Sequence, residues 1–140
     1  MKSYAYDDIA IGQEESFEIT ITAEDMEMFR KITGDDNPLH CDDSYAKKSG
    51  YDGRVVYGML TASYLSALAG MYLPGEKSLI YETGVKFAKP LVWHSGVNLT
   101  VCGKVVEKND MFRHIIIKVS ITDSVGTKIL RETMKVGVTN

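Results

Sequence analysis

Three side chains that can take part in proton transfer lie close together in the sequence: Asp35, Asn37 and His40. A carboxylate and an imidazole are the side chains best suited to moving protons near neutral pH. Pro38 stiffens the backbone between them, so a short turn can hold both groups against one small molecule. The same residue types are also common in turns, where they bond their own backbone. Their types alone therefore leave a structural role and a catalytic role open.

A second candidate feature is Gly58, at the start of an apolar segment. The first N–H groups of a helix have no partner within the helix, and together with the helix dipole they can bind a carbonyl oxygen or an oxyanion. Glycine also lets a substrate approach the backbone closely. The alternative is that Gly58 only permits tight packing where the chain enters the core.

The elements around the first three residues follow from periodicity and capping signals. Alternating apolar residues predict a strand over 15–21, and Thr22 begins a helix that ends at Gly34. Proline disfavours helical geometry in the residue before it, so Asn37-Pro38 ends the helical stretch. We therefore expect Asp35 and His40 to lie on a turn.

The rest of the chain predicts one helix and a sheet. Segment 58–73 is apolar or small on nearly every side, which indicates a buried helix. Four runs without a helical period follow, at 78–87, 97–107, 112–123 and 128–138. Runs joined by short turns should pair antiparallel, so we expect an α+β domain whose sheet covers the apolar helix. A length of 140 residues and 44% apolar residues predict a single domain, 1–140.

Composition narrows the classes of function. The formal charge is −3, and both signs are mixed along the chain, which argues against a nucleic-acid partner. We see neither an export signal nor an apolar run long enough for a membrane span, so we expect a cytoplasmic protein without a membrane partner. Cys41 and Cys102 are expected to be free thiols. With no cluster of cysteine or histidine residues, we expect no metal site.

Two stretches of the chain resemble the MaoC-like dehydratases, a family that includes the (R)-specific enoyl-CoA hydratases. Residues 34–42 read GDDNPLHCD and match the motif G-D-x-N-P-x-H-x-D, and residues 55–63 read VVYGMLTAS and resemble the helix entry of that family. The resemblance runs from about residue 5 to the C-terminus. It implies a hot-dog fold, in which a curved antiparallel β-sheet wraps around a long central helix. It also implies a homodimer whose subunit junction helps to form an acyl-binding tunnel.

The resemblance assigns roles to four residues of the two stretches. Asp35 and His40 correspond to a dyad that activates water for attack on C3 of a trans-2-enoyl thioester and delivers a proton to C2. Which of the two is the base stays open, because the titrations of a coupled pair need not be separable. Asn37 would orient the dyad or the water, and the N–H of Gly58 would stabilise the thioester oxygen.

Two further residues are candidate substrate-binding residues. Many relatives carry histidine immediately before the helix glycine, where this chain has Tyr57, which keeps a hydroxyl but has no imidazole. Ser66 aligns with a polar residue that some relatives place near the dyad, and its alternative is a small core hydroxyl that bonds the preceding turn.

The resemblance thus predicts a hydratase or dehydratase that interconverts an enoyl thioester and an (R)-3-hydroxyacyl thioester. The substrate would be an acyl-CoA or an acyl-carrier-protein thioester, with coenzyme A as part of the substrate and no separate cofactor. One alternative is a hot-dog acyl-thioesterase, in which water attacks the carbonyl carbon. The other is a non-catalytic acyl-binding subunit, against which the intact pair of Asp35 and His40 argues.

Overall fold

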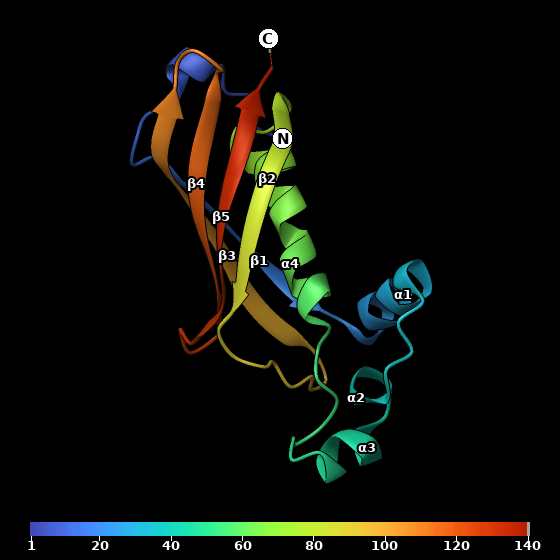
Figure 1. The fold of residues 1–140 in the computed structure, drawn as a ribbon. Coiled ribbons are helices and arrows are strands. Elements are labelled where there is room, and N and C mark those ends of the chain that lie inside the picture. Colours follow the sequence, from blue (N-terminus) through green and yellow to red (C-terminus); the bar gives the residue numbers. More distant parts are fainter. Residues whose placement is uncertain (140) are drawn as a thin grey trace.

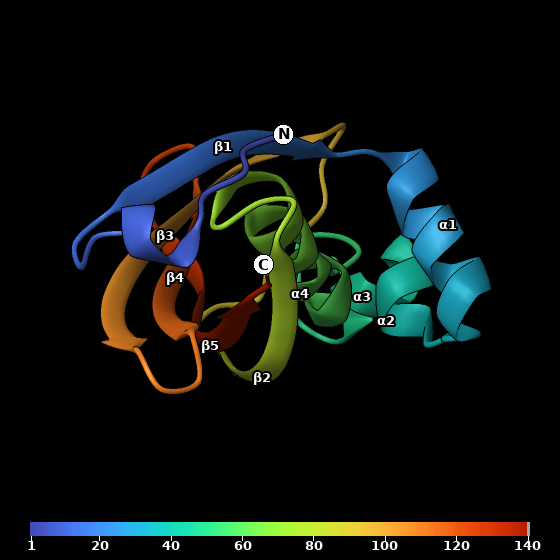
Figure 2. The same ribbon diagram turned by 90° about the horizontal axis from the view of Figure 1, so that it is seen from above.

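The computed structural model describes residues 1–139, which form one curved antiparallel sheet around a helix. Within that range the sheet has five strands in the order β1-β3-β4-β5-β2. Their bounds are Glu14–Ile21 (β1), Ser78–Phe87 (β2), Val97–Asn109 (β3), His114–Asp123 (β4) and Lys128–Val138 (β5). Figure 1 shows helix α4 (Gly58–Ala67) along the sheet, and Figure 2 shows the sheet curling around it. The expected α+β fold is confirmed.

Three further helices lie beyond one end of the sheet: α1 (Ala23–Thr33), α2 (Pro38–Cys41) and α3 (Asp43–Lys48). Helix α1 begins as expected, because the Thr22 hydroxyl accepts the Asp25 N–H while the Asp25 carboxylate accepts the Thr22 N–H. The expected turn around His40 contains a four-residue helix, α2, that sequence analysis did not predict. A 3-10 turn (Tyr6–Asp8) and a π-helical turn (Leu68–Tyr72) complete the helical segments described.

The core forms because buried and more exposed side chains alternate along the central strands. On β4, Ile115, Ile117 and Ile121 are fully buried and face α4, while the side chains between them lie on the other face. On β3 the inward position between two buried valines is Gly103, where a Cβ atom would lie 2.7 Å from a methyl carbon of Leu68. This glycine therefore lets the end of the helix pack directly on the sheet.

Helix α4 is buried less completely than its sequence suggested. The sheet covers one side, whereas Met59 is 62% exposed and Ser63 and Ser66 are also exposed. The expectation of burial on nearly every side is wrong here, because a five-stranded sheet cannot enclose a helix within one chain. Among residues 1–139, no helix is long and apolar enough to cross a lipid bilayer.

One acidic side chain interrupts the core. Glu132 on β5 is 4% exposed, and among residues 1–139 neither of its carboxyl oxygens has a hydrogen-bond partner. Burial raises the pKa of Glu132 from its usual 4.5 to about 7. The carboxyl group is therefore held protonated in the folded chain over a pH range in which the unfolded chain has already lost the proton.

This shift makes the free energy of unfolding depend on pH. Between pH 4.5 and 7 the folded state binds more protons than the unfolded state, so stability falls as pH rises, by about 3 kcal/mol at most above pH 7. We expect Glu132→Gln to match the wild type below pH 4.5 and to be more stable at pH 8. Urea unfolding at both pH values measures the difference, and equal stability at pH 8 would contradict the prediction.

Candidate active site

The loop after α1 presents Asp35 in a defined conformation. Gly34 ends the helix with φ of 73°, a left-handed conformation that glycine adopts without strain. The Asp35 carboxylate then accepts the Asn37 N–H at 3.0 Å, and the Asp35 N–H donates to the Thr33 hydroxyl at 3.2 Å. Short bonds within the loop thus orient an exposed carboxylate.

Asn37 begins the next helix. Its side-chain oxygen accepts the Leu39 N–H at 2.9 Å and caps α2, and Pro38 occupies the first turn, where no N–H is needed. Asn37 orients Asp35 through its backbone N–H, whereas its amide serves α2. Its expected action on the dyad or on water through that amide is untested by these contacts.

A long-range contact orients the ring of His40. Its Nδ1 atom lies 2.7 Å from the carbonyl oxygen of Val55, in the loop that leads to α4. Because a carbonyl oxygen can only accept, Nδ1 carries the proton of this bond. In the neutral imidazole, Nε2 then has the free lone pair and can accept a proton from a bound molecule.

Tyr57 joins the two candidate catalytic residues. Its hydroxyl donates to the backbone carbonyl of Asp35 at 2.7 Å and lies 3.4 Å from the Cys41 sulfur, and its ring centroid is 4.2 Å from that of His40. Burial, with smaller effects of Cys41 and Asp35, raises the pKa of Tyr57 above its usual value, so the hydroxyl stays a donor. The expected substrate-binding residue is thus placed where it holds the Asp35 loop.

We therefore expect Tyr57→Phe to lower kcat by about 10-fold while KM changes less than two-fold, because the Asp35 loop loses an anchor but the pocket keeps its shape. The free energy of unfolding should fall by about 1 kcal/mol, which is the net contribution of one hydrogen bond. Tyr45→Phe, on the exposed side of α3, is the matched control. Steady-state kinetics check the split, and an unchanged kcat would show that the hydroxyl does not position the loop.

Two adjoining cavities bring the candidate residues together. A cavity of about 340 Å³ is lined by both Asp35 and His40, with Tyr57 and Gly58 beside them. Its other lining residues are Phe29, Thr33, Met59 and Phe87. A second cavity, of about 230 Å³, shares His40, Gly58 and Phe87 with the first and continues inward to Thr61.

Gly58 has both of the roles considered for it. A Cβ atom at this position would lie 2.9 Å from the ring of Phe87, so glycine permits this packing. Gly58 is also the first residue of α4, no side chain caps this helix start, and the residue borders both cavities. The unpaired N–H groups of the first turn thus lie beside the space that His40 lines.

One predicted residue lies away from the two cavities, and two residues that contribute to the site were not predicted. Ser66 is exposed two turns along α4 and lines neither cavity, so it is not brought together with Asp35 and His40, nor is it a core hydroxyl. Sequence analysis did not identify Val55, whose carbonyl orients His40, or Phe87, which reaches the site from β2. A backbone acceptor and a distant aromatic residue carry no local sequence signal.

The arrangement suits acid–base chemistry on a small carbonyl compound. A carboxylate and an imidazole nitrogen border one cavity, and the start of a helix borders the same cavity as a site for an oxygen that gains negative charge. Among the described residues, 1–139, no three His, Cys, Asp or Glu side chains gather in a way that could hold a metal ion.

The chain is similar in sequence and in fold to known proteins. The sequence profile of a family described as MaoC like domain matches residues 8–128. A protein from Rhodospirillum rubrum named (R)-specific enoyl-CoA hydratase is 34% identical over 105 residues, which cover 74% of this chain and 73% of the relative.

Two solved structures share the fold. An (R)-hydratase from A. caviae, described as involved in PHA biosynthesis, has a TM-score of 0.86 at 25% identity, covering 93% of this chain and 97% of that one. An unliganded R-hydratase from Pseudomonas aeruginosa has a TM-score of 0.89 at 24% identity, covering 97% of this chain and 86% of that one. The hot-dog fold implied by the sequence is confirmed.

Proposed function

Because this chain belongs to the MaoC-like dehydratase family, we propose that it interconverts a trans-2-enoyl thioester and the (R)-3-hydroxyacyl thioester. The observation that carries the proposal is the single cavity bordered by Asp35, His40 and Gly58. The name of the Rhodospirillum rubrum relative supports coenzyme A as the thiol and the (R) configuration of the product. An acyl-carrier-protein thioester would present the same reacting atoms.

In the proposed mechanism, one group stabilises the negative charge that develops on the substrate, and two other residues transfer protons. The thioester oxygen binds at the N–H of Gly58, where the helix start stabilises the negative charge that develops when water attacks C3. Asp35 and His40 together take one proton from the attacking water and return one proton to C2. The pair thus ends each cycle in its starting state.

Hydration involves no oxidation or reduction, so it needs only proton transfer and stabilisation of charge. We therefore propose that the protein uses no separate cofactor and that coenzyme A enters only as part of the substrate. Asp35, His40 and Gly58 supply the groups that this chemistry requires.

One assay with crotonyl-CoA tests the proposal against both alternatives. We expect the enoyl absorbance to fall without release of free thiol, and the product to be (R)-3-hydroxybutyryl-CoA on chiral analysis. Thiol release would instead indicate a thioesterase. No change with either crotonyl-CoA or longer enoyl-CoA substrates would indicate a non-catalytic acyl-binding subunit.

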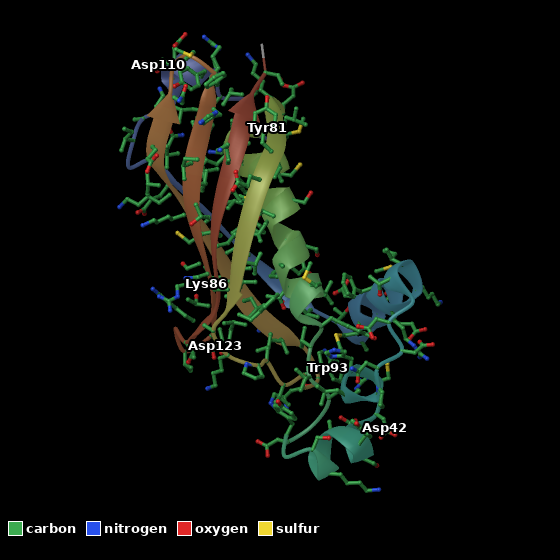
Figure 3. All side chains as sticks on the ribbon, viewed as in Figure 1. Asp42, Tyr81, Lys86, Trp93, Asp110 and Asp123 are labelled. Atoms are coloured by element: carbon green, nitrogen blue, oxygen red, sulfur yellow. The ribbon has the colours of Figure 1, made fainter. Side chains whose placement is uncertain are left out.

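We also propose a homodimer in which β2 pairs with its copy. β2 is an edge strand of the sheet formed by residues 1–139 and is exposed along nearly its whole length, with Tyr81 and Lys86 towards its two ends (Figure 3). Exposed apolar side chains gather there: Leu79, Ile80, Tyr81 and Phe87, with Met59 on α4. Such an edge favours pairing with another strand. Light scattering should give twice the chain mass of 15.6 kDa, and a monomer mass would contradict the proposal.

A further inference from the structure

A hollow of about 560 Å³ lies on the outer face of the sheet, the face that points away from α4. Its lining residues come from all five strands, and none of them borders either cavity of the candidate active site. Its volume is in the range of sites that bind small molecules. Five of the sixteen Lys and Arg side chains of the chain border it: Lys86, Lys104, Lys118, Lys128 and Arg131.

The register of the sheet sets four of these cations directly opposite one another. Lys104 on β3 is the cross-strand partner of Lys118 on β4, and Arg131 on β5 is the partner of Lys86 on β2. Paired side chains share one face of the sheet with their Cβ atoms about 5 Å apart, and like charges at such positions destabilise the sheet. The residues on either side of Lys118 and Arg131 are buried in the core, so both pairs project outwards, and Figure 3 labels Lys86 on that side.

Acidic side chains do not neutralise the hollow. Glu14 on β1 pairs with Lys104 at 3.1 Å, but among residues 1–139 the other four cations form no ion pair. Glu132 also borders the hollow, and burial raises its pKa to about 7, so it carries only part of a charge near neutral pH. Burial raises the pKa of the Cys102 thiol as well, which keeps it neutral. The hollow is therefore strongly positive, although the chain as a whole is negative.

The uncharged groups of the hollow also suit an oxyanion. Thr133 and Ser120 are the cross-strand partners of Lys118 and Arg131, so two hydroxyl groups lie among the cations. Gly84 lies opposite Thr133, and a Cβ atom there would meet nothing within 4 Å. Glycine weakens the interior of a strand and often marks a place where a ligand approaches the backbone closely. Packing within the chain does not require this glycine, and a ligand in the hollow would explain it.

We propose that this hollow binds a compound with a chain of phosphate groups, such as a nucleoside triphosphate or an inorganic polyphosphate. Ammonium and guanidinium groups form short, charge-assisted hydrogen bonds to phosphate oxygens, and a guanidinium can bind two oxygens at once. The cations come from four neighbouring strands that together span about 14 Å, so they surround one compact ligand. Several phosphate groups are needed because a single one would neutralise only part of the charge. The site is separate from the catalytic cavity and does not depend on the hydratase function.

Calorimetric titration of the full-length protein with tripolyphosphate at low ionic strength tests the site. We expect tripolyphosphate to bind at least ~10-fold more tightly than orthophosphate, because it contacts more of the cations at once. A double variant with Lys118→Gln and Arg131→Gln should bind it about 100-fold more weakly, since each lost charge-assisted hydrogen bond costs roughly 10-fold. The matched control carries Lys47→Gln and Lys48→Gln, which make the same change in net charge on the exposed side of α3. It should bind like the wild type.

Amide chemical shifts place the bound ligand. In a titration of the ¹⁵N-labelled wild type with tripolyphosphate, we expect the resonances of Lys118, Ser120 and Thr133 to move. Those of Asp35 and His40, which line the catalytic cavity, should stay in place. Shifts that cluster away from the outer face of the sheet would overturn the proposal.

The binding data have equally definite outcomes. No heat of binding at millimolar tripolyphosphate, or equal dissociation constants in the two double variants, would overturn the proposal. Equal binding of a hexaglutamate peptide and tripolyphosphate would also overturn it, in favour of an acidic protein partner. ATP distinguishes the two sources of a phosphate chain: tighter binding than tripolyphosphate supports a nucleotide, and equal or weaker binding supports an inorganic polyphosphate. Hydration of crotonyl-CoA is scored separately, so failure of the hydratase would leave this result unchanged.

Discussion

Replacing His40 by alanine is expected to lower kcat/KM for hydration of crotonyl-CoA by at least ~100-fold. Its Nδ1 atom donates to the Val55 carbonyl oxygen at 2.7 Å, so Nε2 carries the free lone pair of the neutral ring, and His40 borders the cavity that Asp35 also lines. Alanine removes this acceptor and leaves the Val55 carbonyl to be satisfied by water. The loss should appear mainly in kcat, because the ring acts on protons in the transition state.

The matched control for this change is His114→Ala. His114 begins β4 and stacks on Phe112 with the ring centroids 6.1 Å apart, and it lines neither cavity of the site. The His114→Ala variant should therefore hydrate crotonyl-CoA at the wild-type rate. Circular dichroism and the elution volume of the wild type on size exclusion establish that both variants fold. A folded His40→Ala variant with near wild-type kcat would remove His40 from the mechanism.

Asp35→Asn is expected to reduce hydration by at least ~100-fold for a different reason. The amide oxygen of asparagine can still accept the Asn37 N–H that Asp35 accepts at 3.0 Å, so the loop should keep its conformation. The variant loses only the negative charge and the capacity to take up a proton. Rates measured with saturating crotonyl-CoA isolate this loss from any change in binding.

The neighbouring residue offers a control that differs in one respect. Asp36→Asn makes the same change in charge on the same loop, but the Asp36 carboxylate bonds Arg30 instead of lining the cavity. We expect it to retain most of the wild-type activity. If both asparagine variants lost activity equally, the loop's net charge would explain the effect, and Asp35 would lose its specific role.

Much of the fold was predictable because its signals are local. Strands β2 and β5 have the predicted bounds, since alternation and turn residues are properties of adjacent positions. The cap of α1 depends on side chains three residues from the N–H groups they bind. The motif from Gly34 to Asp42 likewise identified the loop that carries Asp35 and His40, because its residues act on one another's backbone.

Long-range contacts decided the rest. The order β1-β3-β4-β5-β2 puts β2 beside the last strand, which no short turn specifies. The Val55 carbonyl selects the tautomer of His40, and the Tyr57 hydroxyl anchors Asp35, although 22 residues separate Tyr57 from Asp35. The pairing register of β5 points the Glu132 side chain into the core, because a shift of one residue would place it on the outer face of the sheet.

By itself, then, the sequence determined which side chains can move protons and that they share one loop. Only the tertiary structure decided that Gly58 and Phe87 border the same cavity as Asp35 and His40. The physical reason is that local hydrogen bonds and side-chain periodicity set the elements. The shape and polarity of a pocket depend on which distant elements pack together.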